Sequence, residues 1–180
     1  MKIVKLLAGA ACAVTMLLSS AAHASSQEWV LSGVTFDDGG TLSGHFATDS
    51  VTGDLLSYDL TSTDGSILGG HHYNAASSSL FGNNVTGPNS FLIINNSPWA
   101  NPYLNLRFDA ALTSATSSTT VQLGDFNTGA GSWECDNCSS MRLVTAGMVT
   151  AVPEPETYAM LLGGLGLVGV AARRRERKAV

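Results

Sequence analysis

The sequence predicts a mainly β protein, a single antiparallel β-sandwich or jelly-roll-like domain between two membrane-directed ends. In the middle of the chain Lys, Glu, Gln and Arg are scarce, and Ser, Thr, Gly, Asn and Asp separate short apolar runs. Such a composition favours strands and turns over helices. At each end an uncharged apolar segment lies beside basic residues, which is typical of membrane insertion.

Seven short apolar runs are expected as strands, and strands of this number and spacing favour a sandwich. Asp37-Asp38-Gly39-Gly40 is a hairpin signal, because Asp and Gly tolerate the positive φ of a tight turn. Further turns are expected at 51–54 and 63–66, and a long loop holding one strand at most at 69–88. The expected strands are Trp29–Phe36, Thr41–Thr48, Leu55–Thr61, Phe91–Asn95, Tyr103–Asp109, Thr119–Phe126 and Met141–Thr150.

Residues 1–24 are predicted to be a signal peptide. Lys2 and Lys5 form a basic start, an apolar stretch follows, and Ala22-His23-Ala24 is a small-x-small cleavage site that would leave Ser25 as the new N-terminus. The expected partners are the Sec export machinery and signal peptidase. Cleavage would also remove Cys12.

Residues 152–178 form the predicted tail, which follows a body of residues 25–151. The stretch 158–172 has no charge and would extend about 22 Å as a helix, short of a hydrocarbon core of about 30 Å. Local bilayer thinning could still accommodate it as a transmembrane helix. A basic end favours a cytoplasmic C-terminus and places the body outside. Its basic residues are Arg173, Arg174, Arg175, Arg177 and Lys178.

The tail combines Val152-Pro153-Glu154-Pro155, the apolar run and the basic end in that order. This combination resembles the PEP-CTERM sorting signal of exported Gram-negative proteins. The resemblance implies that an exosortase-type membrane protease recognises Pro153 to Pro155, with Val152 before them. It also implies a transient inner-membrane intermediate, an exopolysaccharide-producing host, and delivery to the cell surface or extracellular matrix.

The charge of the body limits its partners. It holds eleven acidic residues and only two basic ones, Arg107 and Arg142, so its formal charge is −9. Such a surface repels phosphate backbones, which argues against nucleic-acid binding. It is compatible with solubility outside the cell and with divalent cations.

Cys135 and Cys138 are the cysteines left after signal cleavage, and an oxidising compartment favours a disulfide between them. A redox role would need a thioredoxin-like βαβ frame, and zinc would need two more soft ligands. The pair is therefore expected to staple a turn.

No catalytic residue, metal site or cofactor is assigned from the sequence. If their segment is extended, His71 and His72 point to opposite faces and cannot share a metal, whereas in a loop they could do so with an Asp as third ligand. His45 has no evident link to them. Asp-rich turns could offer oxygen ligands to Ca²⁺ but are ordinary turn chemistry. Glu28 and Glu134 each adjoin a tryptophan that could stack on a sugar.

These observations predict an exported, non-enzymatic protein that is structural, adhesive or carbohydrate-associated. Two alternatives remain open at this stage: a secreted enzyme acting on polysaccharide, and a Ca²⁺-dependent binding module.

Overall fold

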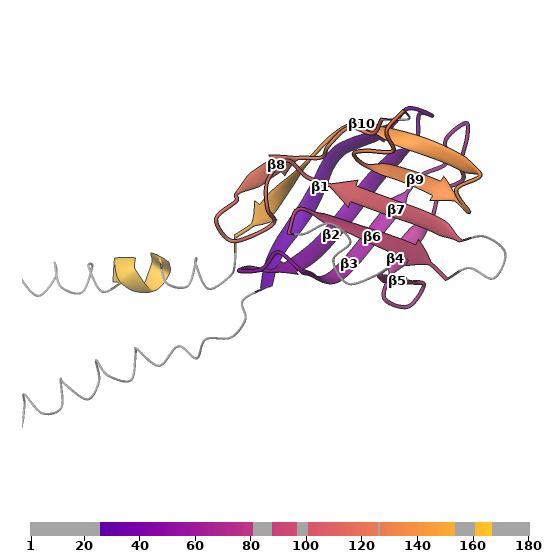
Figure 1. Ribbon diagram of the computed structural model, residues 1–180. Helices are drawn as coiled ribbons and strands as arrows, with labels where there is room; N and C mark the ends of the chain where they lie inside the picture. Colours follow the sequence, from indigo (N-terminus) through magenta and orange to yellow (C-terminus); the bar gives the residue numbers. More distant parts are fainter. Residues whose placement is uncertain (1–25, 81–87, 97–100, 126, 154–160, 167–180) are drawn as a thin grey trace, which may run out of the picture.

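The computed structural model describes residues 26–80, 88–96, 101–125, 127–153 and 161–166 (Figure 1). Within these residues the body is mainly β, as predicted, and its strands form one antiparallel 10-stranded sheet. The strands are β1 (Ser26–Phe36), β2 (Thr41–Asp49), β3 (Leu55–Ser62), β4 (His72–Asn74), β5 (Ser78–Leu80), β6 (Ser90–Asn95), β7 (Pro102–Arg107), β8 (Ser118–Thr120), β9 (Trp133–Asp136) and β10 (Ser140–Val152).

The sheet curls into a nearly closed, barrel-like shape (Figure 1). Its strand order is β4-β3-β2-β1-β10-β9-β7-β6-β5, and β8 pairs with β10 off this path. Side chains bridge the seam between the two ends of this order: Asn95 Nδ2 and Ser77 Oγ donate to the His72 carbonyl at 3.2 and 2.9 Å. One curled sheet thus replaces the two separate sheets of the expected sandwich.

The long strand β10 explains why a single curled sheet forms and not a two-sheet sandwich. Its first residues, Ser140 to Leu143, pair with β9, and Met148 to Thr150 pair with β8. Along its other side β10 pairs with β1 from Val144 to Val152. The 13 residues of β10 thus pair with β1, which continues to β2, β3 and β4, and with β9, which continues to β7, β6 and β5. These two halves of the sheet stay hydrogen-bonded through β10, where a sandwich would have two separate sheets.

The interior is filled by aromatic and aliphatic side chains from both halves. Phe46 on β2 packs edge-on against Phe91 on β6 with ring centroids 5.1 Å apart, and Phe108 lies 5.8 Å from each of them. Trp29 is fully buried, and its indole N–H donates to Thr48 Oγ1 at 2.9 Å, so its polar atom is satisfied. Thr48 in turn donates to the Leu112 carbonyl at 2.7 Å.

Most of the expected strands are present. Of the expected strand Thr119–Phe126, only Thr119 and Thr120 belong to β8, and Val121 makes an isolated bridge with Phe108. The chain then enters a turn in which the Asp125 N–H donates to the Ala130 carbonyl at 3.0 Å, and Phe126 lies outside the described residues. β9 is not among the expected strands, because it is short and includes the charged Glu134. The expected long loop contains β4 and β5, and residues 81–87 lie outside the described part.

The expected turns at 37–40 and 51–54 are confirmed, whereas residues 63–65 are irregular and only a bend follows from Ser66. Between β1 and β2, Gly39 has a φ of 88° and the Phe36 N–H donates to the Gly40 carbonyl at 2.8 Å. Between β2 and β3, Asp49 Oδ1 accepts the N–H groups of Val51 and Thr52, both at 2.8 Å. These hydrogen bonds stabilise the carboxylate and lower the pKa of Asp49.

We predict that Gly44→Ala lowers the free energy of unfolding by about 3 kcal/mol, measured by urea denaturation. Gly44 has a φ of 126°, and a Cβ there would overlap the Asp59 carbonyl oxygen and lie 2.9 Å from Leu60 Cα. Gly33 is the matched control within β1: its φ is 63° but its Cβ would meet nothing within 4 Å, so Gly33→Ala should cost only about 1 kcal/mol. Equal losses would contradict a packing role for Gly44.

Candidate functional site

The first strand of the body begins at the end of the barrel where the last strand finishes. β1 starts at Ser26, β10 finishes at Val152, and the antiparallel pairing sets Glu28 opposite Val152 (Figure 1). Gln27 Nε2 reinforces the pair by donating to the Val152 carbonyl at 3.1 Å. We call this end of the barrel the termini end. The opposite end, with the β1–β2 and β9–β10 turns, is the hairpin end.

The sorting residues begin where the sheet stops. Val152 is the last residue of β10 and half-buried, whereas Pro153 is exposed. Proline has no N–H to donate, so it cannot extend the ladder with β1. Glu154 and Pro155 lie outside the described residues. The motif therefore starts at the edge of the folded body with no spacer.

The other predicted targeting residues also lie outside the described part: Ala22, Ala24, Ser25, Arg173, Arg174, Arg175, Arg177 and Lys178. Within the expected membrane segment, residues 161–166 are helical and exposed. Across the residues that the structure describes, no helix combines the length and the hydropathy needed to cross a bilayer. The span at 158–172 and the signal peptide stay predictions.

The last strand of the body therefore leads directly into the exposed Pro153. The family model of the PEP-CTERM protein-sorting motif matches residues 151–175, so the chain carries the motif that its sequence indicated. The motif implies export, an exosortase as processing partner, and a surface or extracellular location. No curated protein and no solved structure matches the chain.

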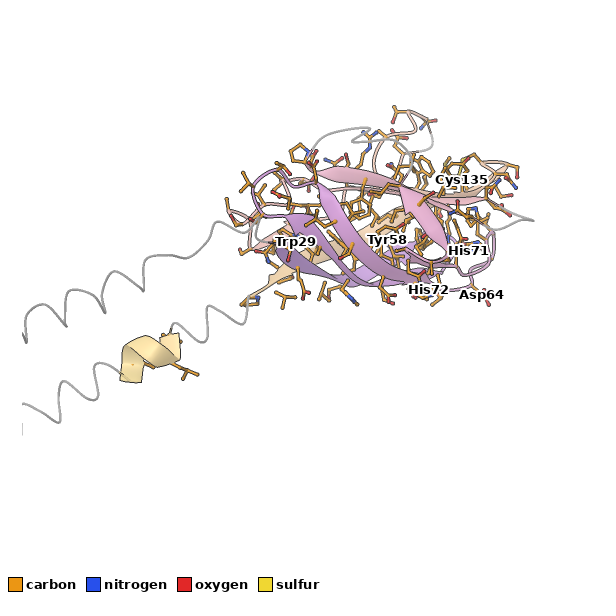
Figure 2. All side chains as sticks on the ribbon, turned by 90° about the horizontal axis from the view of Figure 1, so that it is seen from below. Trp29, Tyr58, Asp64, His71, His72 and Cys135 are labelled. Atoms are coloured by element: carbon orange, nitrogen blue, oxygen red, sulfur yellow. A yellow bond between two sulfur atoms is a disulfide. The ribbon has the colours of Figure 1, made fainter. Side chains whose placement is uncertain are left out.

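The predicted disulfide is present at the hairpin end. Cys135 on β9 and Cys138 in the β9–β10 turn are bonded, with their Cα atoms 4.8 Å apart. Asn137 and Cys138 both have left-handed backbones, with φ of 46° and 49°. Figure 2 shows Cys135, Asp64 and His71 towards this end and Trp29 towards the other. The bond staples a turn, which is the role expected from the sequence.

Beside the disulfide lies a buried ion cluster that the sequence did not reveal, formed by Asp38, Glu134 and Arg142. Arg142 Nε and Nη2 donate to Glu134 Oε2 at 3.0 and 2.7 Å. Its Nη1 lies 3.3 Å from Asp38 Oδ2. All three side chains have 0% exposure.

Neutral groups complete this cluster. Ser62 and Tyr73 donate their hydroxyls to Glu134 Oε1 at 2.9 and 2.7 Å, and Arg142 Nη1 donates to the Thr63 carbonyl at 2.9 Å. The guanidinium carbon of Arg142 lies 4.2 Å from the Phe36 ring centroid, within cation–π range. The hydrogen bonds satisfy charges that would otherwise be costly to bury.

Two carboxylates face one guanidinium in the ion cluster, and hydrogen-bond donors stabilise the excess negative charge. Burial raises the pKa of Asp38, but the N–H groups of Gly40, Leu68 and Ile67, together with Arg142, outweigh it and hold that pKa below its usual 3.8. Burial, and then the charge of Glu134, raise the pKa of Tyr73 far above 10.0. Tyr73 therefore stays protonated, and its hydroxyl donates a hydrogen bond to Glu134.

The ion cluster joins the β1–β2 turn to β3, β4, β9 and β10, so it ties both halves of the sheet together at the hairpin end. Because its carboxylates have no exposed surface, they cannot meet a substrate in this structure. Glu28 is exposed at the termini end, so the two glutamates of the body are not a pair. Trp133 is half-buried and Trp29 fully buried, which leaves neither as an open sugar platform.

The histidines and turn aspartates have local partners. His72 Nε2 lies 2.7 Å from Asp59 Oδ1, while the ring of His71 lies 6.2 Å from that of Tyr73, so the two neighbours point to different partners as expected. His45 pairs with Asp59 in the β2–β3 register. Among the described residues no group of three or more His, Cys, Asp or Glu could hold a metal ion.

We predict that Arg142→Met lowers the free energy of unfolding by about 3–5 kcal/mol, because two buried carboxylates lose their counter-charge. Arg107, the other arginine of the body, is the control. It is half-buried and its Nε has no hydrogen-bond partner, so Arg107→Met should cost less than about 1 kcal/mol. Urea denaturation of both variants gives the comparison. Losses of equal size would show that the ion cluster does not hold the hairpin end together.

Tyr73 should make stability fall as the pH rises above 10. The tyrosine of the unfolded chain loses its proton near pH 10.0, whereas the folded state keeps it, so stabilisation by Tyr73 is complete below that pH and declines above it. The slope should approach about 1.4 kcal/mol per pH unit. Tyr73→Phe should abolish this part of the slope in urea titrations above and below pH 10. An unchanged slope would contradict the buried, protonated state.

Proposed function

We propose that this protein is exported, held by its tail at the outer face of the inner membrane, and then passed by an exosortase to the cell surface or extracellular matrix. There its β body acts as a structural, adhesive or carbohydrate-associated component. The observation that carries this proposal is the sorting motif at residues 151–175, which begins on the last two residues of β10. A processing enzyme would meet it directly beside a folded body.

The composition of the body supports an extracellular role. A formal charge of −9 with no lysine favours solubility and repulsion between copies. The Cys135–Cys138 disulfide suits an oxidising compartment. Ten antiparallel strands curled on themselves leave short protected edges, which limits aggregation of a β protein outside the cell.

A non-enzymatic role is favoured over polysaccharide cleavage by the positions of the glutamates. Hydrolysis of a glycosidic bond uses two carboxyl groups facing one another across a bound sugar. Here Glu134 is buried against Arg142, and Glu28 lies at the opposite end of the barrel. The turn residues Asp49 and Asp64 accept N–H groups within their own loops, which favours a turn role over calcium binding.

We expect that replacing Pro153, Glu154 and Pro155 by three alanines keeps the body out of the surface and medium fractions. The apolar tail remains, so the protein should accumulate with the inner membrane, as followed by cell fractionation and immunoblotting. Keeping the length constant separates recognition of the motif from a change in spacing. Thr157→Ala, just after the Pro-Glu-Pro triplet, is the control and should be delivered normally. An unaltered distribution of the triple-alanine variant would refute sorting through these residues.

A further inference from the structure

Backbone hydrogen bonds connect the chain segments at the termini end of the barrel. The Ala151 N–H donates to the Ser117 carbonyl, and the Ser114 N–H to the Ser50 carbonyl, both at 2.8 Å. The β2–β3 turn projects beside them, with Val51 at its tip 80% exposed. Val152 is therefore fixed to the same rigid end as this turn.

The chain between this end and the expected membrane segment is short. Residues 153–157 separate Val152 from Tyr158, where the uncharged run begins. Even fully extended, this link reaches only about 20 Å. β1 alone has 11 residues and, at about 3.3 Å each with the tilt of a barrel strand, spans roughly 30 Å between the two ends of the body. The link is too short for the body to turn over and place its hairpin end on the bilayer.

We propose that, while the tail spans the membrane, the termini end of the barrel faces the lipid surface and the hairpin end points away from it. This orientation rests on the proposed tethering by the tail. It puts the β2–β3 turn against the headgroups and holds the disulfide and the ion cluster at the distal end. Because β1 starts at this same end, a signal peptide still attached through Ser25 would lead into the same membrane.

The charge of the termini end indicates that the tail, and not the surface, holds the body there. Asp49 flanks the exposed Val51, and the N–H groups of Thr52 and Val51 keep its pKa low, so it is ionised at neutral pH. Glu28 adds an exposed carboxylate opposite Val152. Anionic lipid headgroups repel such groups. Cutting the tail would therefore leave a body with no affinity for the membrane it has faced.

The test uses the chain from Ser25 to Val180, the form that signal cleavage would leave and that lacks Cys12, reconstituted into phosphatidylcholine vesicles that carry a headgroup-attached fluorescence quencher. One variant places a fluorophore at Val51→Cys at the termini end. The other uses Ile67→Cys, which is 50% exposed in the β3–β4 connection at the hairpin end. We expect quenching at position 51 to exceed that at position 67 several-fold. A forty-residue Gly-Ser insertion after Val152, about 35 Å in r.m.s. length, should abolish the difference.

The outcomes separate orientation from tethering. If the protein floats with the vesicles but the two positions are quenched equally, or position 67 more, the orientation is wrong while the tether stands. If the protein does not float, the tether itself fails, and the orientation fails with it. A difference that survives the Gly-Ser insertion would also overturn the proposal, because it would show that something other than the short link orients the body.

Discussion

The central position of the C-terminal strand determines the rest of this structure. β10 pairs with β1 on one side and with β9 and β8 on the other, so the last strand of the body completes the sheet. One end of β10 carries Arg142 into the hairpin end, and the other delivers Val152 to the edge of the fold. Closure of the barrel, placement of the ion cluster and the position of Val152, where the sorting motif starts, thus depend on one set of backbone hydrogen bonds.

The two ends of the barrel have different physical characters. The hairpin end is held by a disulfide and by the buried Asp38, Glu134 and Arg142. Hydrogen-bond donors on β3 and β4, and in the β1–β2 and β3–β4 connections, stabilise the two carboxylates. Such a cluster specifies which strands meet, because a shifted register would leave a buried charge unpaired. The termini end is held by backbone pairing and by Gln27, and it leads directly into the tail.

Much of the fold follows from local patterns. Alternation in β1 buries Trp29 and Leu31 on one face, and the Asp-Gly pair after Phe36 makes the turn, so a strand and a hairpin could be predicted there. The disulfide followed from compartment and spacing. β9 could not be predicted, because a glutamate at position 134 indicates a surface position when the sequence is considered alone. Only the pairing of β9 with β10 brings Arg142, eight residues later in the sequence, opposite Glu134. Its role depends on a contact between strands, which local propensity does not encode.

The sequence by itself determined that the protein is mainly β and carries a sorting motif at residues 151–175, because both follow from short-range order: alternation, turn residues, and a motif read along the chain. Only the tertiary structure decided that one curled sheet forms in place of a sandwich, that Glu134 is buried against Arg142, and that Ser26 and Val152 share one end of the body. These features depend on which strands pair across long separations, and pairing is selected by the packing of the whole core.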